Sequence, residues 1–83
     1  MSLPASLDLH SVPGLLKQAD ALAASGTLDL SAVQHADSAG IAFLVELARR
    51  AKRQGKGLRF TGAGTQVRRL TAFFELDPLL DLA

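Results

Sequence analysis

The chain has 83 residues, the length of one small domain, and 48% of them are hydrophobic, which is enough for one core and argues against disorder. It has no cysteine, which excludes disulfides and thiolate metal sites, and its net charge of +1 selects no class of partner. No apolar run reaches the roughly 18 residues that span a bilayer, and no signal peptide is recognised. We expect a single domain over residues 1–83, with residues 1–6 disordered or contributed by a cloning vector.

The first half of the chain predicts a helix followed by a strand. Residues 4–10 alternate weakly and suggest an extended entry segment. Ser11 is a good helix cap and Gly26 a natural stop, and the apolar residues between them repeat at helical spacing, which predicts a helix over 12–24. Alternating apolar residues then predict a strand over 27–33.

The longest helical pattern begins near Ala39 and ends at Gln54, before Gly55. Its apolar stripe at helical spacing consists of Ile41, Leu44, Val45, Ala48 and Ala51. Phe43 lies roughly 140° from the centre of this stripe at 100° per residue, so we expect it to point outward. Phe43 with Leu47 then either packs against a neighbouring helix or forms part of a partner interface.

The second half predicts a short strand over 58–61, a glycine-rich turn and a third helix that starts at Thr65. The inward face of that helix is Val67, Leu70, Thr71 and Phe74. Strands separated by helices predict a mostly parallel sheet in an α/β fold. Two strands are too few for a stable sheet, so the N-terminal segment or a partner must complete it.

Asp37 and Ser38 stand where the predicted strand 27–33 leads into the longest helix. The simpler interpretation is that they cap the helix by accepting hydrogen bonds from free N–H groups. The alternative is that Ser38 is phosphorylated, or lies at the centre of a partner surface, because a helix N-terminus favours negative charge. The residues leave both interpretations open.

Other chemistry has weak support. His10 and His35 are not at metal-ligand spacing, and the triad Ser38–His35–Asp37 is too local in sequence to converge. The glycines at 62 and 64 lack the lysine of a phosphate-binding loop. The basic stretch 49–59 is a solvated face, or one that meets an anionic membrane or an acidic protein. Without tyrosine or tryptophan for stacking, nucleic-acid binding is not expected.

The segment from Leu28 to Leu44 resembles the STAS domain family, named after sulfate transporters and anti-sigma-factor antagonists. The matching feature is an apolar strand followed by Asp37-Ser38-Ala39-Gly40 at the start of a helix, which fits the family pattern Asp-Ser/Thr-x-Gly. The resemblance covers about residues 7–80, and the MlaB-like subgroup is the most similar. It implies a small parallel sheet with helices on one face. The usual N-terminal strand is shortened or missing, which favours homodimer pairing through an open edge.

The resemblance also implies a function without catalysis, metal or cofactor. MlaB-like proteins are cytoplasmic subunits that bind the ATPase of a phospholipid ABC transporter, and so lie at the inner membrane through their complex. Ser38 matches the position at which the family contacts its partner, and we expect the partner-binding residues to be Asp37, Ser38, Ala39, Gly40, Phe43 and Leu47. The alternative function is that of an anti-sigma-factor antagonist, in which a kinase partner phosphorylates Ser38 and the added charge releases the complex.

Overall fold

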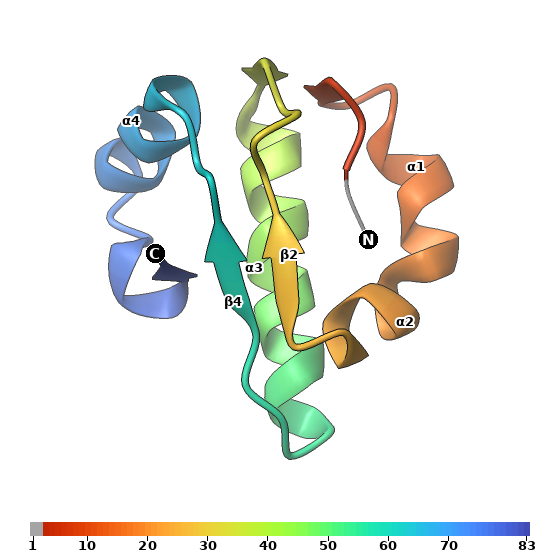
Figure 1. Cartoon of the computed structure of the whole chain (residues 1–83). Helices are drawn as coiled ribbons and strands as arrows, with labels where there is room; N and C mark the ends of the chain where they lie inside the picture. The colour runs from red at the N-terminus through yellow and green to blue at the C-terminus, as the bar shows by residue number, and fades with distance from the viewer. Residues whose placement is uncertain (1–2) are drawn as a thin grey trace.

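The computed structural model, which describes residues 3–83, contains two small parallel sheets (Figure 1). In the first, β1 (Ser6–Leu7) pairs with β3 (His35–Ala36). In the second, β4 (Arg59–Thr61) lies between β2 (Thr27–Asp29) and β5 (Asp81–Leu82). The parallel α/β fold expected from the sequence is therefore confirmed.

Helical segments connect the strands and lie behind or beside the sheet in Figure 1. They are α1 (Val12–Leu15), the 3₁₀ turn η1 (Leu16–Gln18), α2 (Ala19–Ala24), α3 (Ser38–Arg53), α4 (Thr65–Phe73) and the 3₁₀ turn η2 (Asp77–Leu79). The helix predicted over 12–24 is thus divided into α1, η1 and α2. The helix predicted from Ala39 to Gln54 matches α3 within one residue at each end.

The strand predicted over 27–33 is interrupted after Asp29. The two carboxylate oxygens of Asp29 accept hydrogen bonds from the N–H and the hydroxyl of Ser31, both at 2.9 Å. This local turn takes the backbone out of the ladder, and pairing resumes only at β3. The short apolar end of the chain, for which we predicted no strand, supplies β5.

The N-terminal strand, which we expected to be shortened or missing relative to the family, is present but short. Leu7 in β1 is fully buried, and Leu3 just before it is 3% exposed. Of residues 1–6, which we expected to be disordered or contributed by a cloning vector, residues 3–6 are described here and Ser6 lies in β1. Residues 1–2 lie outside the described part of the chain.

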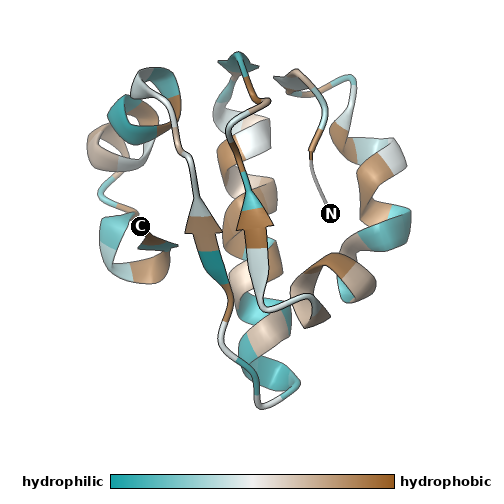
Figure 2. Ribbon diagram, viewed as in Figure 1, coloured by the Kyte–Doolittle hydropathy of each residue, from teal (hydrophilic) through white to brown (hydrophobic). Residues whose placement is uncertain are grey.

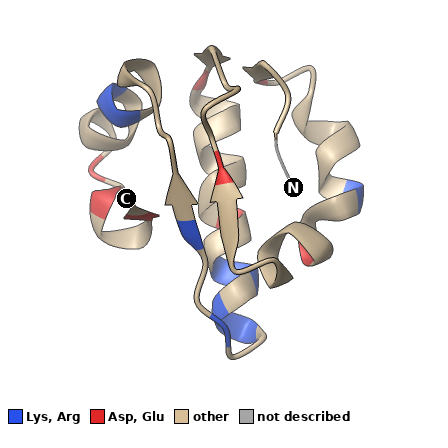
Figure 3. Ribbon diagram, viewed as in Figure 1, with Lys and Arg blue, Asp and Glu red and all other residues tan. Residues whose placement is uncertain are grey.

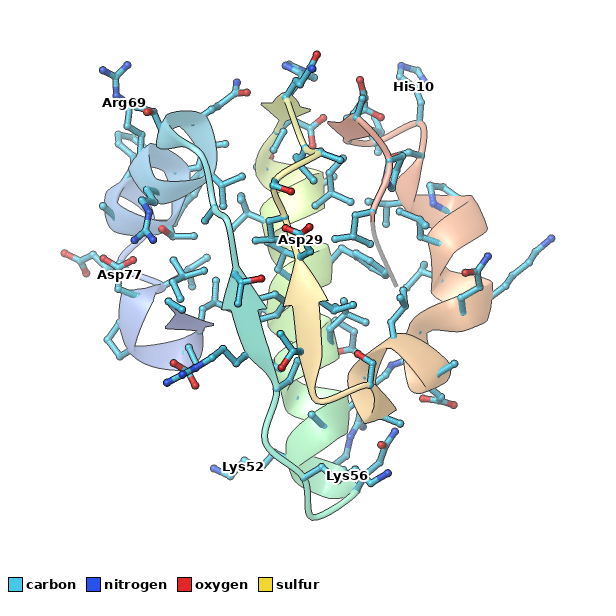
Figure 4. All side chains as sticks on the ribbon, in the orientation of Figure 1. His10, Asp29, Lys52, Lys56, Arg69 and Asp77 are labelled. Atoms are coloured by element: carbon cyan, nitrogen blue, oxygen red, sulfur yellow. The ribbon has the colours of Figure 1, made fainter. Side chains whose placement is uncertain are left out.

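The core lies between the sheet and α3. Leu28 of β2 and Phe60 of β4 are completely buried, as are Leu44 and Leu47 of α3. Apolar colour accordingly marks the two strands and much of α3 in Figure 2. The opposite face of the sheet is open, and Asp29 on this face lies in front of the ribbon in Figure 4.

The outward direction expected for Phe43 is wrong, because its side chain is only 2% exposed. The centre of the buried face of α3 is formed by Leu44, Leu47 and Ala51. Phe43 lies only about 70° from that centre at 100° per residue. Val45 and Ala48, which belong to the predicted apolar stripe, are only half-buried and lie at the border of the buried face.

Candidate functional site

Asp37 is the residue that caps α3. Its backbone is extended, and its Oδ1 accepts a hydrogen bond of 3.0 Å from the N–H of Gly40. Its Oδ2 accepts another, of 3.1 Å, from the N–H of Leu9 in the loop after β1. These hydrogen bonds to the charged form lower the pKa of the Asp37 carboxyl, with the Gly40 N–H as the largest cause. One side chain thus both starts α3 and fixes it to the N-terminal segment.

Gly40 allows the N-terminal strand to approach this turn. The backbone N–H of Asp37 donates to the carbonyl oxygen of Leu7 over 3.3 Å. A Cβ atom at position 40 would overlap that oxygen and lie 2.8 Å from the Leu7 carbonyl carbon. The glycine of the Asp-Ser-x-Gly pattern is therefore required by packing between α3 and β1, and it contributes no outward surface.

The third element that holds the turn is α4. The side-chain Oε1 of Gln66 accepts a hydrogen bond of 3.1 Å from the backbone N–H of Ala36, which directly precedes Asp37. Residues from β1, β3 and α4 therefore fix the start of α3 together. A turn held in this way presents its exposed side chains in one geometry, which lowers the entropic cost of binding.

Ser38 is the first residue of α3, and its side chain is exposed. Within residues 3–83 the Ser38 hydroxyl makes no hydrogen bond. Because Asp37 caps the helix, the capping interpretation does not apply to Ser38, and its hydroxyl is available to an external group.

The residues expected at a partner surface divide into two groups. Ser38 is exposed, and Asp37 and Ala39 are half-buried, so these three lie together at the start of α3. The others point into the core and cannot touch a partner in this conformation; they are Gly40, Phe43 and Leu47.

Sequence reasoning missed the residues that surround Ser38 instead. A shallow hollow beside its hydroxyl is lined by Ile41 and Ala42 of α3 and by Phe74 and Leu76, which follow α4. Ala42 could have been found from its spacing of four residues from Ser38, which places both on one side of a helix. Phe74, expected on the inward face, is 44% exposed.

The position of Phe74 follows from how α4 ends. Glu75 has a left-handed backbone with φ of 56°. The N–H of Leu76 then donates to the carbonyl of Thr71 over 2.8 Å, and that of Glu75 to Ala72 over 3.1 Å, which together form a Schellman motif. The chain turns sharply there and brings Leu76 and η2 back beside α3.

The basic stretch is partly neutralised within the molecule. Arg50 forms ion pairs with Glu46 at 2.8 Å and Asp20 at 3.1 Å, which join α3 to α2, and Arg53 also contacts Glu46. The hydrogen bond from Arg50 lowers the pKa of the Glu46 carboxyl. Arg49 and Lys52 have no ion pair to any described residue, and the C-terminal end of α3 is marked blue for lysine and arginine in Figure 3.

Metal and membrane chemistry find no counterpart in the described residues. Residues 3–83 contain no group of three histidine or acidic side chains placed to hold a metal ion. His35 is exposed in β3, and Figure 4 places His10 at the edge of the molecule. In the same residues, every helix is too short or too polar to cross a membrane.

Comparison with known proteins connects these features to a family. The family model described as "Mlab, STAS domain" matches residues 1–81, which is nearly the whole chain. A search of curated proteins gives no match. The parallel sheet with helices on one face, and the capped turn at Asp37, agree with the fold that this family implies. STAS domains generally act as interaction modules without catalytic activity. The chain belongs to the STAS domain family.

Proposed function

We propose that this protein is a non-catalytic subunit that binds the ATPase of an MlaB-like phospholipid ABC transporter. Binding occurs through the surface made by Ser38, Ala39 and Ala42 of α3 with Phe74 and Leu76. The protein needs no cofactor or metal, and it lies at the cytoplasmic face of the inner membrane through its complex. The single observation that carries the proposal is the exposed Ser38 hydroxyl, which is free of any capping role and borders an apolar hollow.

Two features of the surface favour a protein partner over a small substrate. The hollow beside Ser38 is shallow and mainly apolar, with one hydroxyl and no acid–base pair, which suits side-chain packing better than a reaction. The turn is also fixed before any partner arrives, by Leu7 and Leu9 of the N-terminal segment and by Gln66 of α4. Preorganised surfaces lose less entropy on association.

Co-purification with the ATPase subunit of the ABC transporter from the same organism tests the proposal. Ser38→Arg places a long cation in the middle of the surface, and we expect it to abolish co-purification while the circular dichroism spectrum stays folded. Ala21→Arg is the matched control, because Ala21 is an exposed residue of α2 away from this surface. Retention of the ATPase by both variants would contradict the proposal.

The same observation supports a second function, that of an anti-sigma-factor antagonist. A phosphate on Ser38 would leave the Asp37 cap in place and add about −1.5 to −2 charge at the partner surface. Incubation with the candidate kinase, followed by intact mass measurement, separates the two functions. A single phosphate on the wild type, absent in Ser38→Ala, favours the antagonist, and no mass change favours the transporter subunit.

The proposed homodimer is a separate question of oligomeric state. Light scattering coupled to size-exclusion chromatography distinguishes a mass of 8.7 kDa from twice that value. A mass of 8.7 kDa would contradict the homodimer and would leave the proposed ATPase binding unaffected.

A further inference from the structure

Two hollows lie one after the other along α3, the first beside Ser38 and the second beside Arg49 and Lys52. The outer side of α3 carries Ser38, Ala42, Val45, Arg49 and Lys52, at spacings of four and three residues that align them along the helix. From Ser38 to Lys52 this line is about 21 Å long at 1.5 Å per residue. We call it, with the chain from Phe74 to Leu79 beside it, the α3 groove.

The second half of the α3 groove has a wall of its own. Val45, Arg49 and Lys52 face Pro78 and Leu79 of η2 across a hollow that is more apolar than polar. Leu79, the last residue of η2, is 54% exposed and adds apolar surface to this wall. The apolar surface therefore extends well beyond Ser38, to the C-terminal part of α3.

The charge of the α3 groove is uneven along its length. At the Ser38 end its lining is neutral, whereas at the other end Arg49 and Lys52 have no acidic partner within residues 3–83. Asp77 directly precedes Pro78 in the sequence, but it lines a different hollow, together with Arg68, on the far side of η2. An occupant of the groove thus meets apolar contacts throughout and positive charge at one end only.

We propose that the α3 groove binds an amphipathic helix of the partner protein, with an apolar stripe and carboxylates at the end that meets Arg49 and Lys52. This proposal rests on the proposed function, and it adds the chemistry and placement of the partner segment. Small side chains at Ser38 and Ala42 let a second helix approach α3 closely, and spacings of three and four residues match side-chain packing between helices. An acidic segment complements the unpaired cations, which gives register and orientation.

An anionic membrane fits the same surface less well. Glu75 lies between Phe74 and Leu76 of the apolar wall, and its side chain is exposed. Its carboxylate would be brought against lipid phosphates if the wall entered a bilayer, and like charges repel at such distances. A narrow helix can place its carboxylates at Arg49 and Lys52 alone.

Site-specific photo-crosslinking in the assembled complex tests the proposal. Benzoylphenylalanine replaces Phe74 at the Ser38 end, Leu79 at the basic end, or Lys17 on η1 as a control away from the groove. After irradiation, the partner peptide joined to each position is identified by mass spectrometry. We expect positions 74 and 79 to label one partner helix about two to three turns apart, with aspartate or glutamate near the position 79 product. Lys17 should label nothing.

Charge reversal gives an independent readout of affinity. Arg49→Glu with Lys52→Glu should weaken partner binding about tenfold at low salt, and the loss should shrink at 0.5 M salt because exposed charges are screened. Lys17→Glu with Arg69→Glu changes the net charge equally and should leave the affinity unchanged. Arg69 on α4 and Lys52 on α3 lie at opposite ends of the molecule in Figure 4.

The outcomes separate this proposal from the proposed function. The acidic-helix proposal is overturned if position 74 labels the partner and position 79 does not. It is also overturned if position 79 labels lipid, a second copy of this protein, or a partner segment without carboxylates. Each of these results leaves the proposed Ser38 surface intact. Labelling from neither position overturns both. Equal affinity of the Arg49/Lys52 variant and the wild type also overturns the acidic helix.

Discussion

The substitution Gly40→Ala tests whether close contact between α3 and β1 holds the Ser38 turn in place. The new Cβ would overlap the Leu7 carbonyl oxygen, and it would lie 2.8 Å from the carbonyl carbon and 3.1 Å from Leu7 Cγ. Carbon atoms pack at about 3.5–4.0 Å, so β1 must move by roughly 1 Å. Two of these contacts are backbone atoms, which cannot turn away as a flexible side chain would.

The expected change in stability has two unfavourable contributions and one favourable one. Overpacking a tight contact costs about 1–3 kcal/mol, and displacement of the fully buried Leu7 adds part of the about 1.5–3 kcal/mol gained by its burial. The higher helix propensity of alanine returns about 1 kcal/mol. The net loss is about 2 kcal/mol, which lowers the melting temperature by roughly 8–16 °C in a domain of this size.

Urea unfolding followed by circular dichroism measures this loss directly. The matched control is Gly14→Ala in α1, where a Cβ meets no atom within 4 Å. We expect the control to gain about 0.5–1 kcal/mol, because alanine restricts the unfolded chain. If Gly40→Ala were as stable as the wild type, the contact between α3 and β1 would not be the reason for glycine at this position.

Three further substitutions test the rest of the structure. Hydrogen bonds lower the pKa of the Asp37 carboxyl in the folded protein, so its stabilising contribution is complete above pH about 4 and is lost as pH falls through the lowered pKa. Asp37→Asn should therefore be less stable than the wild type at pH 7. In thermal unfolding, the difference between the two should shrink toward pH 2. Phe43→Ala should lose about 3–5 kcal/mol in urea unfolding, whereas a change below about 0.5 kcal/mol would mean an exposed ring. Glu75→Gly should gain about 0.5–1 kcal/mol in the same assay, since a left-handed backbone strains any residue with a Cβ, and a loss would refute the assigned turn.

The sequence predicts the order of the elements well because helices and strands here follow hydrophobic periodicity. The long helix has clear limits, with Asp37 before it and Gly55 after it, and the structure places α3 within one residue of the prediction. Strand lengths were predicted less well. The strand ends after Asp29 because its carboxylate accepts hydrogen bonds from Ser31. A pattern of apolar residues does not show whether such polar hydrogen bonds will form.

The candidate site was predicted in part, and the errors have one physical origin. Periodicity locates an apolar stripe, but the direction of its centre is uncertain when apolar residues cover more than half of a helix. Including Val45 and omitting Leu47 turned the expected buried face of α3 and placed Phe43 outside. The contribution of Phe74 could not be predicted, because it depends on the left-handed residue Glu75, which is a conformation that glycine or asparagine usually adopts.

Hydrogen–deuterium exchange of the free protein and of its complex with the ATPase tests the central claim most directly, namely that the partner binds the surface around Ser38. We predict slower exchange in the complex at the start of α3, over residues 37–40, and along the wall over 74–79. Exchange over 27–29 and 59–61, on the open face of the sheet, should stay unchanged. Slower exchange confined to those strands, with the Ser38 turn unaffected, would contradict the account.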